Sequence, residues 1–262
     1  MTETELYKDK QWLPTTKKEI EHLGWDYIDV IIFSGDAYID HPSMGSAVIG
    51  RILEANGYRV AIVPQPNWRD DLRDFTKLGK PRLFFGVSAG AMDSMVNHYT
   101  ANRRKRSDDA YTPNGKAGMR PDYPSIIYTQ ALKKLYPDVP VIIGGIEASM
   151  RRLSHYDYWQ DTLRPSILID SKADILVYGM GEKPILEIAN YLRDGKQISE
   201  LTDIPQTAIC VNASSIPEHL DSEKEELLHS HEECLKDKKL HAANFKVIEI
   251  ESNKWQGRTL WQ

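Results

Sequence analysis

Short apolar runs that alternate with helical segments restrict the fold of this chain more than any other feature. The first run, residues 28–33, contains a single polar residue and lies between Gly24 and Ser34. A short, β-branched run of this kind is typical of a strand that is buried on both faces of a sheet. Four further runs have the same character, at residues 58–63, 82–87, 139–143 and 173–178.

Segments with apolar residues at helical spacing separate these runs. Residues 46–56 show this spacing, and Gly57 is suited to end that helix. Residues 68–78 and 183–193 are the other predicted helices of this region. Strands that are joined through helices form right-handed crossovers and therefore a parallel sheet. The predicted fold class is α/β, a Rossmann-like parallel sheet flanked by helices over residues 24–196.

The alternation stops after this domain. Residues 1–23 are interpreted as an N-terminal extension and residues 197–262 as a linker or C-terminal extension. Three elements are predicted in the C-terminal extension, an edge strand, one charged and solvated helix and a last strand, at residues 207–211, 218–240 and 247–250. The sequence ends at the apolar Trp261 and at Gln262, without a polar tail. We therefore expect the chain to be the N-terminal part of a longer protein.

Composition excludes several functional classes. A net charge of −5 argues against general nucleic-acid binding, because phosphate contacts require a basic face. The only cysteines are Cys210 and Cys234, which excludes a disulfide framework and a complete cysteine-ligated metal site. The sequence begins without an apolar signal segment, and its apolar runs are far shorter than the roughly 20 residues that span a bilayer. We therefore expect a cytoplasmic protein with no membrane partner.

Small and polar residues follow the five predicted strands, at the edge where open α/β sheets bind ligands. Residues 35–45 lead from the first strand into the first helix, whose N-terminal amides can hold an anion or a polar ligand. The alternative is an ordinary connecting loop, because neither a GxGxxG fingerprint nor a phosphate-binding P-loop is present. The ligand-crevice candidates from this region are Ser34, Gly35, Asp36, Tyr38, Asp40, His41, Ser43 and Gly45.

The loop after the third strand, residues 86–90, has the spacing of a nucleophile elbow. On that interpretation Ser88 would be a hydrolase nucleophile, with His98 or His155 as its base. We favour a turn of small residues that packs against the sheet, because nothing in the sequence places either histidine near the serine. Ser88 and Gly90 remain candidates for the crevice.

The loops after the last two strands complete the candidate crevice. Glu147 and Ser149 are expected at the crevice, and Arg151 and Arg152, at the start of the next helix, either clamp a phosphate or carboxylate or form ion pairs with nearby acids. Glu182 follows a tight turn and is placed to favour the start of a helix. The candidates from these loops are Gly144, Gly145, Glu147, Ser149, Arg151, Arg152, Gly179, Gly181 and Glu182.

A long polar loop, residues 102–123, carries the strongest basic run, Arg103–Arg106. This run could contact RNA, but Asp108 and Asp109 follow it directly, and we favour a structured loop with internal salt bridges. A loop of this length inside a compact domain is often functional.

Two further groups of residues have competing interpretations. His229, His231, Cys234 and His241 are close in sequence and suggest metal ligands, but on a helix the first two histidines point about 200° apart. A solvated helix without metal is favoured. An aromatic set either stacks on a flat ligand or packs helices on the sheet, with packing favoured: Tyr38, Tyr99, Tyr111, Tyr156, Tyr158 and Trp159.

Several longer motifs carry a resemblance that covers nearly all of the chain. They are residues 34–45 (SGDAYIDHPSMG), 86–101 (GVSAGAMDSMVNHYTA), 106–113 (RSDDAYTP), 144–159 (GGIEASMRRLSHYDYW) and 171–182 (SKADILVYGMGE). These motifs are similar to the YgiQ-like radical S-adenosylmethionine (SAM) proteins. The strand-end loops resemble the cobalamin-binding-like domain that precedes many radical SAM cores.

The resemblance implies a full-length enzyme in which a TIM-like barrel follows this domain. It also implies a [4Fe–4S] cluster that is held by a CxxxCxxC triplet and reduces SAM. The triplet is absent here, and two cysteines cannot supply three converging thiolates. We therefore expect this chain to bind neither cluster, SAM nor metal, to be inactive alone, and to have the missing barrel as its partner. Its catalytic residues and its small-molecule or macromolecular substrate are unknown.

The resemblance also suggests cobalamin as a ligand of the crevice. Modules that ligate cobalt use the pattern D-x-H-x-x-G, whereas Asp40 and His41 are adjacent here and the glycine follows four residues after the histidine. The alternatives are a corrinoid bound without His41, another ligand, or none. The resulting function hypothesis is an accessory domain of a radical SAM enzyme that faces its substrate or cofactor. The alternative is a non-catalytic ligand- or RNA-binding module that uses the crevice or the Arg103–Arg106 loop.

Overall fold

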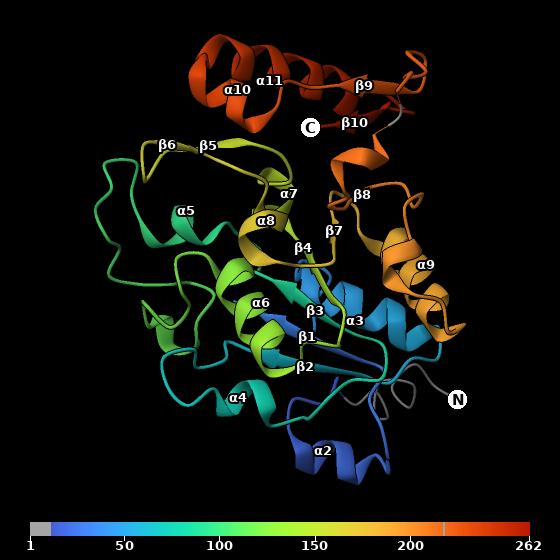
Figure 1. Ribbon diagram of the computed structural model, residues 1–262. Helices are drawn as coiled ribbons and strands as arrows, with labels where there is room; N and C mark the ends of the chain where they lie inside the picture. The colour runs from blue at the N-terminus through green and yellow to red at the C-terminus, as the bar shows by residue number, and fades with distance from the viewer. Residues whose placement is uncertain (1–11, 217) are drawn as a thin grey trace.

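A computed structural model shows the fold of the chain and describes residues 12–216 and 218–262 (Figure 1). A six-stranded sheet forms its centre, in the order β2-β1-β3-β4-β7-β8. Its strands are β1 (Val30–Ser34), β2 (Val60–Pro64), β3 (Phe84–Ser88), β4 (Val141–Gly144), β7 (Ile175–Val177) and β8 (Thr207–Ala208). The first five are parallel, and β8 pairs antiparallel with β7. The predicted parallel sheet and its five strands are confirmed, and the predicted edge strand is shortened to two residues.

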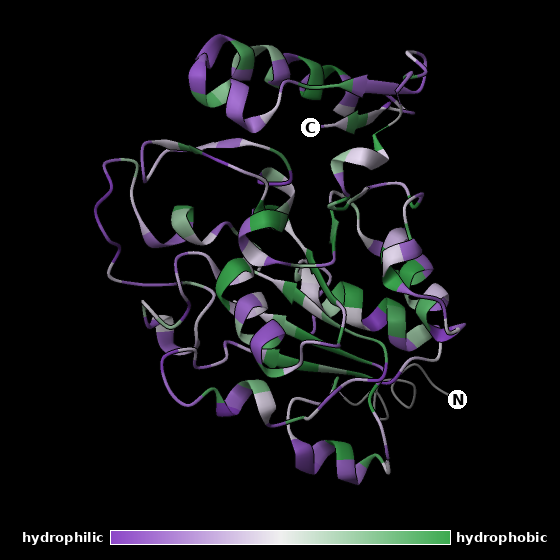
Figure 2. Cartoon of the chain, in the orientation of Figure 1, coloured by the Kyte–Doolittle hydropathy of each residue, from purple (hydrophilic) through white to green (hydrophobic). Residues whose placement is uncertain are grey.

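Both faces of this sheet are buried, as its apolar strands predict (Figure 2). Ile31 and Phe33 of β1 point into one hydrophobic cluster, whereas Val30 and Ile32 point into another. The helices that cover the first face are α4 (Arg73–Thr76), α6 (Pro124–Leu135) and α8 (Ile167–Ser171). The helices that cover the second are α3 (Gly45–Ala55) and α9 (Glu182–Arg193). The alternation of side chains along each strand thus places one helical layer on either side.

The helix predicted for residues 46–56 is confirmed as α3, and the one predicted for residues 183–193 as α9. Of residues 68–78, only the single turn α4 is helical. Before the sheet, Thr16 caps α2 (Lys17–His22), and its hydroxyl accepts a bond from the Glu19 amide at 3.3 Å. Leu13 and Ile20 are buried in the two clusters. The described part of the predicted extension therefore packs on the sheet domain, and residues 1–11 lie outside the described residues.

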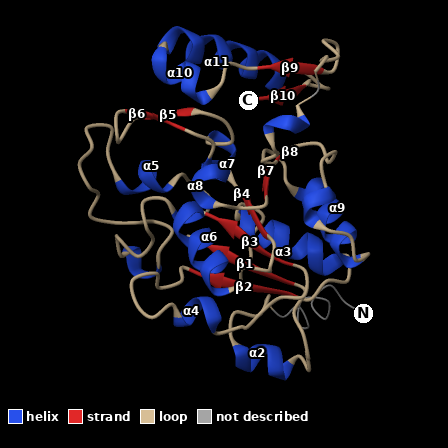
Figure 3. Cartoon of the chain, viewed as in Figure 1, coloured by secondary structure: helices blue, strands red, loops and turns tan. Residues whose placement is uncertain are grey.

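Short elements fill the connections at the carboxyl edge of the sheet (Figure 3). They are α5 (Ser94–His98), α7 (Ile146–Met150) and an antiparallel pair, β5 (His155–Asp157) and β6 (Thr162–Arg164). Arg151 and Arg152 directly follow α7, so the expectation that they begin a helix is wrong.

Two predictions for the C-terminal extension are wrong. Residues 218–240 do not form one helix, because they contain a strand, β9 (Glu225–Leu227), and a separate helix, α10 (His231–Lys236). Residues 247–250 are not a strand, because they lie inside α11 (Lys238–Ser252). Ser230 and Asp237 cap the two helices and so divide the charged stretch. A last strand, β10 (Thr259–Trp261), pairs in parallel with β9.

Candidate functional site

A buried arginine links the loop after β1 to the long polar loop. The guanidinium of Arg120 is completely buried, and its Nη1 donates to Asp36 Oδ1 and to the carbonyl of Ala89, both at 2.8 Å. Its Nε and Nη2 donate to the carboxylate of Asp109 at 3.3 and 3.2 Å. Such a triad is held in place by its own ion pairs. The candidate Asp36 is therefore engaged within the protein.

The two carboxylates of this triad differ in their titration. Burial raises the pKa of Asp36, although the amide of Ala91 and the charge of Arg120 oppose this. Burial also acts to raise the pKa of Asp109, but bonds from Tyr111 and other groups outweigh it and lower the pKa overall. Asp109 therefore keeps its negative charge beside Arg120 to lower pH than Asp36 does. No local signal in the sequence singles out Arg120, and the site analysis of the sequence missed it.

Three glycines at the strand ends allow the chain to pack closely on itself. A Cβ atom on Gly35 would lie 2.1 Å from the carbonyl oxygen of Ala89. One on Gly90, where φ is +114°, would lie 2.2 Å from Asp36 Oδ1, and one on Gly145 would lie 2.7 Å from Ser88 Oγ. The space beside these candidate residues is thus filled by neighbouring loops and not by a ligand cradle.

The rest of the loop after β1 is exposed or half-buried, apart from the buried Met44. His41 accepts a bond from the Ser43 amide through Nδ1, which lies 2.7 Å from Ser43 Oγ. Asp40 forms an ion pair with Arg51 of α3. Gly45 is the first residue of α3, whose N-cap position has no side-chain hydrogen bond. These candidates lie together at the start of α3, as the sequence predicts, and they are tied to one another.

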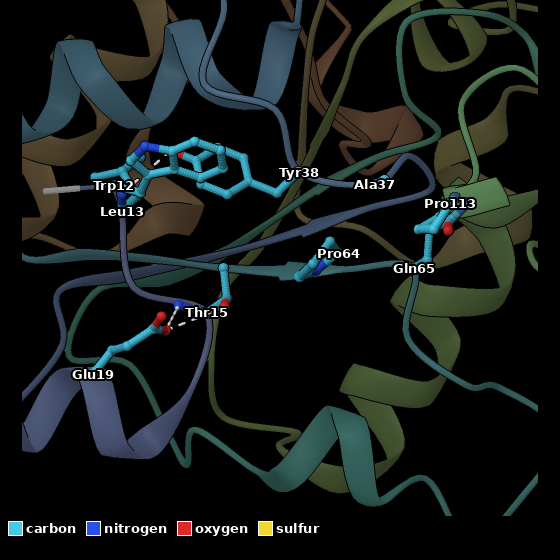
Figure 4. Close-up of a pocket in the computed structure, with 9 residues that line it drawn as sticks. All are labelled: Trp12, Leu13, Thr15, Glu19, Ala37, Tyr38, Pro64, Gln65 and Pro113. Carbon is cyan, nitrogen blue, oxygen red and sulfur yellow. Dashed lines mark hydrogen bonds between the residues drawn. The ribbon is translucent and has the colours of Figure 1, made fainter.

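A pocket of about 320 Å³ lies beside this loop, at the ends of β1 and β2 (Figure 4). Of the candidate residues, only Tyr38 lines it, with Trp12 set edge-on to its ring at 5.9 Å between centroids. Gln65, also in the lining, donates to the carbonyl of Gly35 and to Thr112. The remaining lining residues are Leu13, Thr15, Glu19, Ala37, Pro64 and Pro113.

Ser88 lacks the surroundings of a nucleophile. Its hydroxyl accepts a bond from the Gly90 amide at 3.2 Å. His98 Nδ1 lies 2.8 Å from Asp122, His155 Nδ1 lies 3.2 Å from the carbonyl of Leu153, and neither of these two described histidines hydrogen-bonds to Ser88. Burial lowers the pKa of His155 to about 4. The geometry agrees with the favoured turn of small residues.

Glu147 is the most perturbed acid among the candidates. It is fully buried, and its Oε1 accepts a bond from the Ser125 amide, in the first turn of α6, at 3.0 Å. Burial raises its pKa to about 7, although the charge of Arg151 acts in the opposite direction. The buried oxygens that lack a hydrogen-bond partner among the described residues include Glu147 Oε2 and, on α6, Ser125 Oγ, Tyr128 Oη and Thr129 Oγ1. A buried acid with an unmatched oxygen is a perturbed group of the kind that clusters at functional sites.

The two adjacent arginines have different environments. Arg151 is buried and forms an ion pair with Asp93, which caps α5. Arg152 is half-buried, donates to the carbonyl of Ser149 at 2.8 Å and to Ser252 of α11 at 3.1 Å, and stacks on Tyr178 at 4.9 Å. Arg151 thus follows the ion-pair interpretation, whereas Arg152 links the end of α7 to the C-terminal helices.

The turn after β7 joins the same edge. The Gly179 amide donates to Ser149 Oγ at 3.3 Å, which connects the loops after β4 and β7. Gly181 is the N-cap of α9, and Glu182 is its first residue. The predicted convergence of the loops after β4 and β7 is therefore present.

The first arginine of the basic run packs with part of the aromatic set. Arg103 donates to the carbonyls of Tyr158 and Trp159 and stacks over the Tyr158 ring at 4.5 Å. Trp159 in turn lies 5.3 Å from Tyr99. Tyr99, Tyr158 and Trp159 thus pack on one another among the surface loops, whereas the favoured prediction was that they pack helices on the sheet. The salt bridge inside the long loop is that of Arg120 with Asp109 and does not involve the basic run.

The histidines and cysteine of the C-terminal extension do not converge on a metal. Cys234 is buried and accepts a bond from Asn244, and His231 Nδ1 lies 3.0 Å from Ser154 Oγ. Within residues 12–216 and 218–262, no group of three or more metal-ligating side chains is present.

The cofactors that the resemblance implies were tested against these residues. A [4Fe–4S] cluster does not fit, because Cys234 is buried, Cys210 is exposed, and the whole sequence holds no third thiol. For a corrinoid, the strand-end glycines Gly35 and Gly90 offer no open backbone surface, because each lies against another part of the chain. No reaction step through either group follows from these residues.

No helix among the described residues has both the length and the apolar character that a membrane span requires. Two solved structures of the radical SAM methyltransferase TsrM from Kitasatospora setae have some likeness to this chain. One has tryptophan and a SAM analogue bound, and the other has cobalamin and a [4Fe–4S] cluster. Their TM-scores are 0.44 and 0.43, at 18% identity, and the matches cover 68% and 69% of this chain and 27% of each TsrM chain.

Sequence comparison gives much closer relatives. A UPF0313 protein of Porphyromonas gingivalis is 64% identical over 96% of this chain and 39% of its own length. A UPF0313 protein of Bacteroides thetaiotaomicron is 61% identical over 98% of this chain and 43% of its own length. The UPF0313 protein YgiQ of Escherichia coli is 58% identical over 76% of this chain and 27% of its own length. The chain thus spans less than half the length of these relatives. Residues 12–262 match the family described as Radical SAM N-terminal. The chain therefore belongs to the YgiQ-like, UPF0313 family of radical SAM proteins and is its N-terminal portion.

Proposed function

We propose that this chain is the accessory domain of a radical SAM enzyme and that the carboxyl edge of its sheet faces the catalytic core. Family membership supports a [4Fe–4S] cluster and SAM in the full-length enzyme, held outside this portion. The substrate of the enzyme is not identified by these residues.

The observation that carries this proposal is a set of exposed apolar side chains at one edge. Each of the loops after β1, β3, β4 and β7 exposes at least one: Ile39, Met92, Ile146, Met150 and Met180, between 37% and 70% exposed. Exposed apolar groups that gather at one edge indicate a surface that another part of a protein covers. Beneath them, the buried charges of Asp36, Arg120 and Glu147 fix the loops.

The experiment is anaerobic reconstitution of the full-length protein, with measurement of bound iron and of SAM cleavage. Ile146→Asp should weaken or uncouple SAM cleavage, because it places a charge on the edge. Ile169→Asp is the matched control, since Ile169 is 58% exposed on α8 and Ile146 is 48% exposed. Protein that holds no iron and never cleaves SAM would remove the proposal, and equal effects of the two variants would remove the role of the edge.

The same full-length protein can be titrated with hydroxocobalamin and methylcobalamin before gel filtration. Co-elution with a shifted spectrum would make the domain a corrinoid carrier. Elution without the corrinoid would leave the edge as a wall of the substrate site.

A second candidate function is RNA binding through the Arg103–Arg106 loop. Arg104, Lys105 and Arg106 are exposed and form no ion pair with the described residues. Exposed tyrosines, Tyr156 and Tyr158, lie beside Arg103, and basic and aromatic groups together suit single strands. Salt-sensitive RNA retention that is lost when the four basic residues are replaced by alanine would support this function. No retention at low salt would exclude it.

A further inference from the structure

The C-terminal unit, residues 225–262, folds without an apolar core of its own. Its longest helix, α11, has 15 residues, yet only Asn244 and Glu251 are buried in it. In the whole unit, the buried apolar residues are Leu228 and Cys234. A helix normally stabilises itself in a protein by burying an apolar face.

Apolar side chains of this unit stand in solvent instead. Phe245 and Ile250 of α11 are 62% and 48% exposed, Leu235 of α10 is 56% exposed, and Trp255 is 99% exposed. We call these four residues the α11 surface, in which Phe245 and Ile250 lie about 140° apart around the helix and so flank its buried side. Figure 2 shows the green, apolar segments of α10 and α11 in the layer farthest from the central sheet.

Polar contacts hold the unit together in place of a core. Asn244 Nδ2 donates to the carbonyl of His229 at 2.8 Å, and Asn244 Oδ1 accepts from the His229 amide at 2.9 Å. Glu251 accepts bonds from Arg258 and Lys254 at 2.7–3.0 Å. These directional bonds set the positions of β9, α10 and α11 relative to one another before any apolar surface is covered.

The sheet of this unit is also incomplete. β9 and β10 form a parallel pair of three residues each, separate from the central sheet. Parallel strands occur almost only in larger sheets that are covered on both faces, and a two-stranded sheet is marginal alone. Phe245 and Ile250 of α11 and Leu227 of β9 thus remain uncovered by the described residues.

We propose that the α11 surface and the β9–β10 pair are the docking site for the C-terminal part of the full-length protein, which completes this unit. The inference rests on the proposed function, because it names the catalytic core as the occupant. This chain is the N-terminal portion of its family and spans 39% and 43% of two close relatives, so more than half of such a protein lies outside it.

The position of the unit supports the same occupant. Arg152 of the sheet domain donates to Ser252, and the Ser154 amide donates to the side chain of Gln262 at 2.8 Å. These contacts hold the unit against the segment that follows α7, beside the β5–β6 pair (Figure 1). Because Arg152 and Ser154 follow α7, which carries the exposed Ile146 and Met150, the unit lies next to part of the edge proposed to face the core, and one partner can contact both.

The test compares hydrogen exchange of the α11 amides in the full-length protein and in residues 1–262. Exchange should be slower in the full-length protein by at least about tenfold, because docking suppresses local opening. Phe245→Asp with Ile250→Asp should abolish this difference, whereas Ile169→Asp should retain it. In the isolated chain the paired substitution should leave the melting temperature unchanged, since both side chains are already exposed there.

Equal exchange in the two proteins would overturn the inference. Protection that disappears on dilution, with a dimer in light scattering, would also overturn it and assign the surface to a second copy. Iron content and SAM cleavage are measured on the same samples. An enzyme that cleaves SAM while its α11 remains unprotected fails the docking inference alone, and an enzyme without iron fails the proposed function.

Discussion

Replacement of Glu147 by glutamine should change how the stability of the protein depends on pH. Burial raises the pKa of this carboxyl from 4.5 to about 7. The folded protein therefore retains a proton that the unfolded chain loses at lower pH. Its contribution to the free energy of unfolding is greatest below the unfolded pKa and is lost as the pH rises from about 4.5 through about 7.

The magnitude follows from the size of that shift. A change of one pKa unit corresponds to about 1.4 kcal/mol, so this carboxyl should cost the native state about 3 kcal/mol between pH 4.5 and pH 8. The groups that set this value are Arg151 and Asp93, besides burial and the bond from the Ser125 amide. Glutamine keeps the size and the acceptor for the Ser125 amide but does not titrate, so the decline should be absent in the variant.

The assay is urea unfolding at pH 5, 6, 7 and 8, with the free energy of unfolding of the variant subtracted from that of the wild type. The subtraction removes the titration of groups that the two proteins share. Glu232→Gln on the exposed side of α10 is the control and should give a flat difference. If the difference in unfolding free energy between wild type and Glu147→Gln is also independent of pH across this range, Glu147 does not hold a proton in the folded protein, and the reasoning fails.

Three other perturbations follow from the same structure. Arg120→Met should cost roughly 3–5 kcal/mol of unfolding free energy in denaturant titrations, because it leaves two buried carboxylates uncompensated; a loss below 1 kcal/mol would contradict the triad. Gly90→Ala should cost about 3 kcal/mol or more, from a Cβ 2.2 Å from a carboxylate oxygen, whereas Gly57→Ala, with open space around it, should cost about 1 kcal/mol. A thiol reagent should label Cys210 in the native protein and Cys234 only after unfolding, as quantified by mass spectrometry; rapid labelling of both would contradict the burial of Cys234.

The strands were predictable because their signal is local. Residues 28–33 are apolar whichever partners they have, and burial on both faces follows from that composition. The convergence of the strand-end loops was predictable for a geometric reason, since parallel strands end at one edge. Gly145, Ser149 and Gly179 lie where that reasoning places them.

The roles of the residues at that edge were not predictable from local patterns. Asp36 and Arg120 are 84 residues apart in sequence, and only the folded chain shows that they pair. The short run at residues 247–250 is compatible with a helix or a strand by its pattern alone. It is helical because it lies inside α11, which begins at the cap Asp237. Glu147 was a candidate by position, whereas its burial and raised pKa depend on α6, which the sequence analysis did not identify.

The polar construction of residues 225–262 has a thermal consequence. The heat capacity of unfolding comes mainly from apolar surface that becomes exposed to water, and this unit buries little of it. Its unfolding should therefore add little to the heat-capacity change of the chain. A plot of its free energy of unfolding against temperature should be nearly straight. In scanning calorimetry, the sheet domain would show the usual dome-shaped stability curve, while the C-terminal unit would melt with a nearly constant enthalpy.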